Sequence, residues 1–179
     1  YSVSCWIKPA TANVADRHII ETVSGNTGFL MKLHNDNRLY CYQSAGGDIS
    51  ALCGNVAFPN DGNFHHAVMT FSAGTTNTLK IYVDGALAST VTAAGVPDLT
   101  LSNIPVNIGH GAYSGVIDDV KIFSKTLSDA EVNAEYLKMQ QLVSLKFNDA
   151  TGNTAADSAA YGINGVLTGM NPDTKWANE

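Results

Sequence analysis

Short runs of alternating hydrophobic and polar residues follow one another along most of the chain, and turn-forming residues separate them. Alternation with a period of two places successive side chains on opposite faces of a sheet, so each run is predicted to be a β-strand with one buried face. The first run ends at Pro9, which cannot donate a hydrogen bond to a neighbouring strand. The predicted strands cover residues 1–8, 17–22, 28–34, 38–43, 49–53, 64–72, 78–83, 86–91, 105–109 and 115–123.

The dipeptide Asp84-Gly85 lies between two of these runs and is the strongest hairpin signal in the chain, because a type I′ turn needs positive φ at both central residues. Many short strands within 179 residues predict one domain, an all-β sandwich of two antiparallel sheets. The side chains expected in its core are Trp6, Phe71, Ile81, Val120 and Ile122.

One segment departs from this pattern and is predicted to be a short helix. Ser128 is followed three residues later by Glu131, which is the spacing of a capping box. Val132, Tyr136 and Leu137 then follow at helical spacing.

Composition and charge narrow the functional classes. Charged residues make up 15% of the chain against about 25% in an average protein, and 16 Asn, 16 Gly and 15 Thr supply polar surface instead. A formal charge of −6 without a basic run argues against binding to nucleic acid or to an anionic membrane. No apolar stretch approaches the roughly 20 residues that span a bilayer, so membrane insertion is not expected, and any export signal is expected outside these residues.

Three cysteines leave two alternatives open. Cys41 and Cys53 end two short segments that a turn at residues 46–48 joins, so a disulfide across this hairpin would close a loop worth roughly 3 kcal/mol and imply an oxidising compartment. Two buried free thiols are the alternative. Cys5 is expected to be a small core residue.

Four motifs, taken in order, resemble one family. Residues 1–9 form a strand that ends in an aromatic-aliphatic-Lys-Pro run, 64–71 an aromatic-His-His-hydrophobic strand, 79–85 the hairpin that follows it, and 115–131 a strand followed by a short helix. Over residues 1–137 this order resembles the laminin G-like domains of the concanavalin A-like lectin and glucanase superfamily. The resemblance implies a two-sheet antiparallel jelly roll.

The ends of the chain depart from the family order. A strand such as 142–147 and a loop such as 156–165 open the domain in the family, but here they come last. Residues 1–141 are therefore interpreted as the main part of the sandwich, and residues 142–179 as the opening strand and loop of this sandwich or of a neighbouring copy. The domain is then circularly permuted, or cut out of phase from a tandem repeat whose copies exchange strands.

Catalysis is not predicted. Glycoside hydrolases of the superfamily use two carboxylates that flank the glycosidic bond. Asp118 and Asp119 are adjacent, and neighbouring strand residues point to opposite faces. The same argument separates His65 from His66 as ligands of one metal, and structural hydrogen bonding is the favoured role of this pair. The other histidines, His18, His34 and His110, have no fixed spacing to it.

Calcium is the favoured cofactor. The polar loop 157–165 offers oxygen ligands from Asp157, Asn164 and backbone carbonyls. The family resemblance adds a carboxylate of the strand, from Asp118 or Asp119. The alternative is an ordinary Asx-rich turn, with Asp119 solvated or bonded to the backbone.

Glycan recognition needs an aromatic surface with a few polar groups. The loop 109–114, with His110 and Tyr113, has this composition, and so does the pair Tyr40 and Tyr42, although packing explains each of them individually. The sequence thus predicts a non-catalytic extracellular or cell-surface module for carbohydrate binding or adhesion. The alternative is a structural repeat of an array or filament, whose partner is a neighbouring copy of the same domain.

Overall fold

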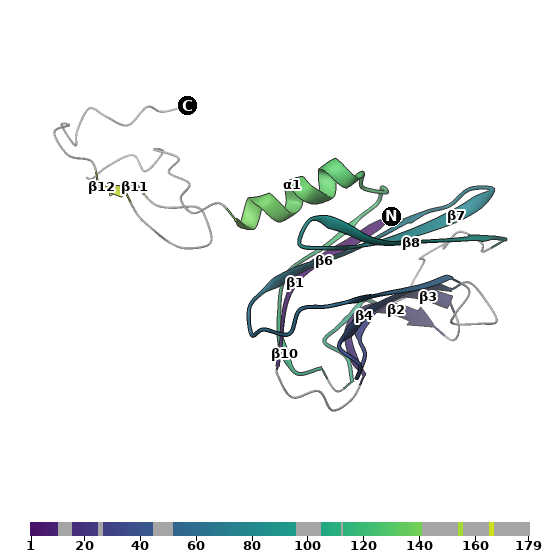
Figure 1. Ribbon diagram of the computed structural model, residues 1–179, viewed down its shortest axis with the longest axis horizontal. Coiled ribbons are helices and arrows are strands. Elements are labelled where there is room, and N and C mark those ends of the chain that lie inside the picture. Colours follow the sequence, from purple (N-terminus) through teal and green to yellow (C-terminus); the bar gives the residue numbers. More distant parts are fainter. Residues whose placement is uncertain are drawn as a thin grey trace. The chain divides into compact units, whose positions relative to one another are not determined.

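The computed structural model describes residues 1–10, 16–24, 27–44, 52–95, 105–111, 113–140, 154–155 and 165–166. The chain divides into two compact units, Tyr1–Asn133 and Ala134–Glu179. In the first unit two five-stranded antiparallel sheets face each other (Figure 1). The predicted fold class, an all-β sandwich with one short helix, is confirmed.

The first sheet has the strand order β10-β1-β6-β7-β8. Strand β1 joins distant parts of the chain. It pairs with β6 on one side and with β10, which comes near the end of the unit, on the other. The strands of this sheet are β1 (Ser2–Pro9), β6 (His65–Ser72), β7 (Thr76–Val83), β8 (Ala86–Ala94) and β10 (Gly115–Phe123).

The second sheet has the strand order β5-β4-β3-β2-β9. Two of its strands differ from the prediction. The strand expected at residues 49–53 is described from Leu52 and continues to Ala57, with residues 49–51 outside the described part of the chain, and the one expected at residues 105–109 is reduced to two residues. The strands are β2 (Arg17–Ser24), β3 (Thr27–Leu33), β4 (Arg38–Ser44), β5 (Leu52–Ala57) and β9 (Asn107–Ile108).

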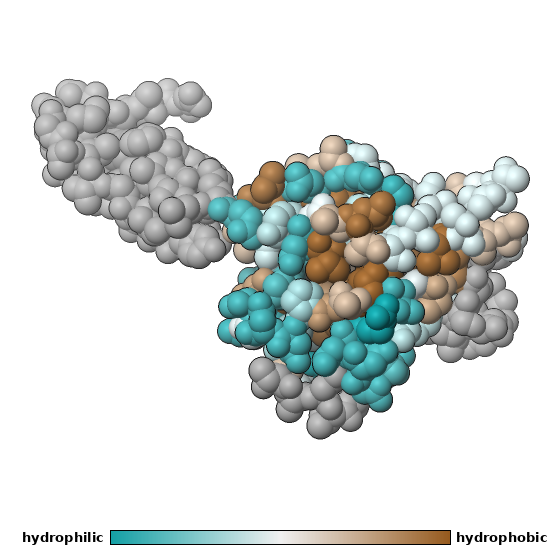
Figure 2. Space-filling view, in the orientation of Figure 1, coloured by the Kyte–Doolittle hydropathy of each residue, from teal (hydrophilic) through white to brown (hydrophobic). Residues whose placement is uncertain are grey.

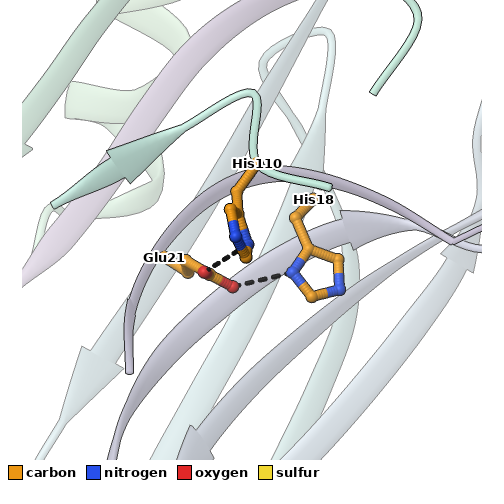
Figure 3. Close-up of side chains that lie close together, drawn as sticks. All are labelled: His18, Glu21 and His110. Atoms are coloured by element: carbon orange, nitrogen blue, oxygen red, sulfur yellow. Dashed lines mark hydrogen bonds and ion pairs between the residues drawn. The ribbon is translucent and has the colours of Figure 1, made fainter. Parts of the chain in front are cut away.

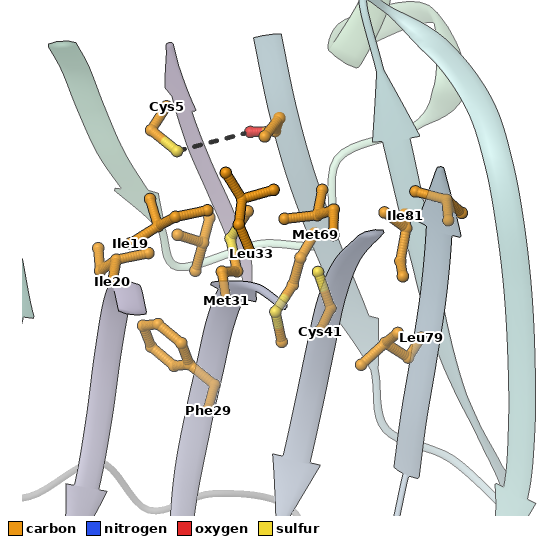
Figure 4. Close-up of a cluster of buried hydrophobic side chains, with 14 of the residues drawn as sticks. Cys5, Ile19, Ile20, Phe29, Met31, Leu33, Cys41, Met69, Leu79 and Ile81 are labelled. Carbon is orange, nitrogen blue, oxygen red and sulfur yellow. Dashed lines mark hydrogen bonds between the residues drawn. The ribbon is translucent and has the colours of Figure 1, made fainter. Parts of the chain in front are cut away.

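The hydrophobic core lies between the two sheets (Figure 4). Phe71 and Ile81 belong to it, as predicted, and Val120 packs against it. Trp6 is also buried, but it stacks on His66 instead of joining this cluster. The core is formed by Val3, Cys5, Ile7, Ile19, Ile20, Phe29, Met31, Leu33, Leu39, Cys41, Leu52, Val56, Phe58, Ala67, Met69, Phe71, Leu79 and Ile81.

The prediction for Ile122 is wrong. It is 44% exposed because it lies on β10, the edge strand of the first sheet. An edge strand has a neighbour on one side only, here β1, and its other side is open. Figure 2 shows hydrophobic side chains on the visible face amid polar ones. The large hydrophobic side chains exposed among the described residues are Phe64, Leu87, Val106, Ile108, Val116, Ile122 and Leu137.

The predicted hairpin and the predicted helix are both present. Asp84 and Gly85 join β7 to β8 with φ of 51° and 76°, as a type I′ turn requires. Helix α1 (Asp129–Met139) begins after Ser128, whose hydroxyl accepts a hydrogen bond from the N–H of Glu131 at 3.3 Å. The Glu131 carboxylate in turn accepts from the N–H of Ser128 at 2.8 Å, which completes the capping box. Val132 is buried.

The structure contradicts the predicted disulfide. Cys41 lies opposite Gly54 across β4 and β5, whereas Cys53 lies opposite Tyr42. This one-residue offset turns the Cys41 side chain into the core and the Cys53 side chain to the other face of the sheet, so the two sulfurs cannot meet. All three cysteines are free, and burial raises the pKa of Cys5 to about 12.

The second unit contains the short antiparallel pair β11 (Thr154–Ala155) and β12 (Gly165–Val166). The strand predicted at residues 142–147 lies outside the described residues, so the permuted or exchanged arrangement of residues 142–179 stays a prediction. Among the helices of the described residues, none has the length and apolar character required to cross a membrane.

Gly115 provides a test of the packing between β10 and β1. Its φ is 137°, and a Cβ at this position would be driven into the carbonyl oxygen of Lys8 on β1. We expect Gly115→Ala to lower the free energy of unfolding by about 2–4 kcal/mol, from backbone strain together with overpacking. Gly74→Ala is the matched control, because a Cβ there has only one neighbour, at 3.5 Å. Urea unfolding of both variants measures the effect, and equal stabilities would contradict it.

Candidate binding face of the second sheet

The second sheet has an outer face that carries a concentration of polar and aromatic side chains. Along β4 every second residue, such as Leu39 and Cys41, is fully buried in the core, and the residues between them point away from it. The same alternation holds along β5. We call this set the outer face: His18, Glu21, Leu30, Lys32, Arg38, Tyr40, Tyr42, Cys53, Asn55 and Asn107.

Strand register brings these residues into two rows across the sheet. In one row Tyr40 lies between Lys32 on β3 and Asn55 on β5. In the other row Tyr42 lies between Leu30 and Cys53. Side chains directly opposite each other on neighbouring strands are within contact distance, so each tyrosine has neighbours on both sides.

The two tyrosines of β4 form an aromatic pair. Their ring centroids are 6.1 Å apart and the planes differ by 15°, so Tyr40 and Tyr42 stack along the strand. The Lys32 ammonium lies 5.9 Å from the centroid of Tyr40 and 5.4 Å from that of Tyr42. This is the distance of a cation–π contact, which stabilises the rings and the charge together. We call Tyr40, Tyr42 and Lys32 the tyrosine site.

Neighbouring polar groups hold the tyrosine site in place. Lys32 donates to the carboxylate of Asp16 at 2.5 Å, and its side chain is only 14% exposed. The hydroxyl of Tyr40 donates to the carboxylate of Asp36 at 3.1 Å. Burial first, and then the charge and the hydrogen bond of Cys53, raise the pKa of Tyr42. These contacts fix the positions of the two phenols.

A guanidinium borders the tyrosine site. Arg38 precedes Tyr40 by two residues on the same face, and its Nε donates to the amide oxygen of Asn55 at 2.6 Å. A planar cation and an amide therefore stand beside aromatic rings, which is a combination that binds hydroxyl and carboxylate groups.

The two residues that the sequence predicts as ligand-binding have different partners in the structure. His110 is 60% exposed and its Nδ1 lies 2.9 Å from the Glu21 carboxylate (Figure 3). The ring of Tyr113 packs against the core, its hydroxyl donates to the carbonyl oxygen of Val116 at 3.1 Å, and burial raises its pKa to about 12. A ligand-binding role for His110 and Tyr113 stays a prediction.

The adjacent histidines of β6 have separate structural partners. Both nitrogens of His65 meet carboxylates, Asp84 at 2.8 Å and Asp61 at 2.9 Å. His66 points to the other face, where its Nε2 lies 2.8 Å from the hydroxyl of Ser4. The structure therefore agrees with the structural role expected for this pair.

The carboxylates predicted to bind calcium are described only in part. Asp119 has φ of 46°, and its backbone N–H donates to the Asp118 carboxylate at 2.8 Å. Its own carboxylate accepts from Lys121 at 2.6 Å. Asp157 and Asn164 lie outside the described residues, so calcium stays a prediction.

Sequence reasoning missed Lys32 and Glu21 as parts of the outer face. The alternation marks Lys32 as a polar residue of a strand, which is a signal that many surface lysines share. Its position over two tyrosines follows from the pairing of β3 with β4. That pairing register is not readable from either strand alone.

Comparison with known proteins identifies the family. A family model described as the concanavalin A-like lectin/glucanases superfamily matches residues 1–133. A search of curated proteins finds no match.

Similar solved structures are receptor-binding domains of botulinum neurotoxins. The domain from type G has a TM-score of 0.57 at 17% identity, over 95% of this chain and 49% of that one. The binding domain of type DC in complex with rat synaptotagmin II has a TM-score of 0.58 at 17% identity, over 90% and 46%. A type C structure, described as showing that cell entry depends upon interaction with two ganglioside molecules, has a TM-score of 0.56 at 19% identity, over 86% and 37%. This chain spans less than half of each, and the likeness is one of fold.

The carboxylate partners of His65 predict a pH dependence of stability. Burial lowers the pKa of His65, but its hydrogen bonds with Asp61 and Asp84 outweigh this and raise the pKa above its ordinary value. The stabilisation is therefore complete below the ordinary histidine pKa of about 6.5 and is lost as the pH rises through the raised value. We expect the difference in unfolding free energy between the wild type and His65→Gln to shrink from about pH 5.5 to about pH 8.5.

Chemical denaturation at several pH values measures this difference. The other four histidines are present in both proteins, so the difference reports on His65 alone. A difference that stays constant over the range would contradict the structural role of the two carboxylates.

Proposed function

Since the chain belongs to the concanavalin A-like lectin/glucanases superfamily through residues 1–133, we propose that it is a non-catalytic extracellular module that binds carbohydrate through the tyrosine site. The observation that carries this proposal is the stacked pair Tyr40 and Tyr42 with Lys32 beside both rings. Adhesion to a glycan-bearing surface is the biological role that follows from it.

The chemistry of the site suits a sugar. A pyranose presents C–H groups on its faces and hydroxyl groups around its rim, so it binds where aromatic surface adjoins fixed donors and acceptors. Tyr40 and Tyr42 provide the aromatic part. Donors and an acceptor come from Lys32 and Asn55, which lie opposite Tyr40 on the neighbouring strands, and from Arg38 on the same strand. Because these side chains already contact one another, little conformational entropy is lost when a ligand binds.

The guanidinium beside the site suits an acidic sugar. Arg38 lies on the same strand as Tyr40, and a guanidinium binds carboxylates through two parallel hydrogen bonds, whereas the charge of Lys32 is already paired with Asp16. Interaction with two ganglioside molecules is named for one of the structurally similar neurotoxins. This supports glycan binding as a class and makes ganglioside oligosaccharides a sensible first probe.

A catalytic role is not part of the proposal. The hydrolases of this fold need one carboxylic acid and one carboxylate on either side of the bond that they cleave. Asp118 accepts a hydrogen bond from the backbone of Asp119, and Asp119 pairs with Lys121, so these two carboxylates hold the irregular middle of β10.

Substitution of Tyr42 tests the tyrosine site. Wild-type protein is first applied to a glycan array that includes ganglioside oligosaccharides, and the strongest ligand is then titrated by calorimetry. We expect Tyr42→Ala to weaken binding by about 10-fold, or ~1.4 kcal/mol, because the ring that contacts the sugar is lost. Tyr42→Phe retains the ring and is expected to keep most of the affinity.

Phe64→Ala is the matched control, because Phe64 is an exposed aromatic residue that does not belong to the outer face. Equal losses in Tyr42→Ala and Phe64→Ala would contradict the assignment. A wild-type protein that binds no glycan on the array would contradict carbohydrate binding itself.

Calcium is proposed as a structural cofactor at Asp157, Asn164 and Asp118 or Asp119. A cation that binds only the folded state raises the melting temperature, and its removal lowers it. We expect calcium to raise the melting temperature and a chelator to lower it, with the increase lost in Asp157→Asn. Differential scanning fluorimetry measures both, and identical melting with calcium and with chelator would remove calcium from the proposal.

A further inference from the structure

A buried carboxylate joins two histidines on the outer face (Figure 3). The cluster borders the tyrosine site, because His18 lies opposite Lys32 across β2 and β3. The Glu21 side chain is 8% exposed, and its two oxygens have different partners. Nδ1 of His18 lies 2.7 Å from Oε2, and Nδ1 of His110 lies 2.9 Å from Oε1. The amide of Asn107 also donates to Oε1, at 3.3 Å. Two imidazole nitrogens therefore converge on one carboxylate.

A β-bulge places two of these residues on the same face. In a regular strand, residues three apart point to opposite sides of the sheet. The register of β2 against β3 shifts between His18 and Ile20, so Ile19 is an extra residue at that point. Both Ile19 and Ile20 are fully buried in the core, and His18 and Glu21 consequently share the outer face.

The third residue is fixed by backbone pairing from a distant part of the chain. Strand β9 pairs with β2, where Asn107 lies opposite Glu21, and the N–H of Gly109 then donates to the carbonyl of Ile19 at 2.9 Å. Gly109 and Gly111 have φ of 67° and 71°, so the chain turns in the left-handed region on each side of His110. These turns direct His110 onto the Glu21 carboxylate, although its ring is largely exposed.

We propose that His18, Glu21 and His110 form a binding site for a transition-metal ion, with Zn²⁺ as the ion of choice. Their ligand atoms all lie within 4.8 Å of one another. Zn²⁺ binds imidazole nitrogen and carboxylate oxygen at about 2.0–2.2 Å, which in a tetrahedral site separates neighbouring ligand atoms by about 3.3 Å. The two histidine–carboxylate contacts, each to a different oxygen of Glu21, are shorter than this by roughly half an ångström. Side-chain rotations that bring both nitrogens around one oxygen convert the hydrogen-bonded cluster into a metal site.

The donor set selects the class of metal. Two nitrogens and one oxygen suit zinc and its neighbours, whereas calcium and magnesium require a shell composed of oxygens. Three protein ligands leave the fourth tetrahedral position to water or to an external group. Asn107 does not bind the ion itself; its amide donates to the Glu21 carboxylate and so orients it.

This inference does not depend on carbohydrate binding, because none of the three ligands belongs to the tyrosine site. It also differs from the calcium proposal in its residues and in its metal. Zinc binding to the whole chain is thus measured in the presence of excess calcium, which saturates an oxygen site and leaves this one unchanged.

The test is calorimetric titration of the metal-free protein with Zn²⁺. We expect one Zn²⁺ per chain, together with an increase in melting temperature. His110→Asn and Glu21→Gln should each weaken the affinity by at least about 10-fold, and Asn107→Leu should weaken it less. His34→Asn is the matched control, because His34 also contacts two carboxylates, Asp16 and Asp36, but within the described part of the chain it belongs to no group of three converging ligand atoms. It should bind zinc as the wild type does.

Substitution with Co²⁺ supplies an independent readout of the ligands. A tetrahedral nitrogen and oxygen site gives visible d–d bands without the intense thiolate-to-cobalt band that Cys53 would add. Circular dichroism establishes whether each variant is folded. If Glu21→Gln does not fold, His110→Asn is the deciding variant, because the His110 side chain is largely exposed. Absence of saturable zinc binding in the wild type would overturn the proposal, and so would unchanged affinity in folded His110→Asn.

Discussion

Burial of one face of each sheet is the constraint on which the structure depends. The sandwich core takes every second side chain of β3, β4 and β5, and the period of two then assigns the remaining side chains to the outer face. A one-residue slip of any of these strands would exchange the two sets. The hydrophobic effect therefore fixes the position of Tyr40, Tyr42 and Lys32 as firmly as it fixes the core, although none of them belongs to the core.

Departures from this period have local consequences. The bulge in β2 keeps two isoleucines inside while two chelating residues, His18 and Glu21, stay outside. Without the extra residue one of the two would point into an apolar core, where an ionised carboxylate is costly. The bulge thus keeps the core apolar and also places His18 and Glu21 side by side on the outer face. A second bulge, in the pairing of β1 with β10, accompanies the positive φ of Asp119.

The sequence is sufficient for the strands and turns because the signals involved are local. Alternation located nearly all of the strands, the Asp84-Gly85 dipeptide located its hairpin, and Ser128 with Glu131 located the start of the helix. Motif order indicated the family, and the family match over residues 1–133 confirms it.

The parts that could not be predicted depend on pairing between distant segments. Cys41 and Cys53 have a spacing that permits a bridge, but the register of β4 against β5 separates them onto opposite faces. Glu21 and His110 are far apart in sequence, and only the pairing of β2 with β9 makes them neighbours. Register is determined by the whole sandwich, and it is therefore invisible in either segment alone.

The separation of the cysteines also gives the protein a reporter position. Cys5 and Cys41 are buried, while Cys53 is partly exposed on the outer face opposite Tyr42. A maleimide dye applied to the native protein will accordingly react first at Cys53, since the other two thiols are shielded from reagent. Because Cys41 and Cys53 are not bridged, Cys53 keeps a partly exposed thiol beside the tyrosines, where a fluorophore senses any ligand that approaches them.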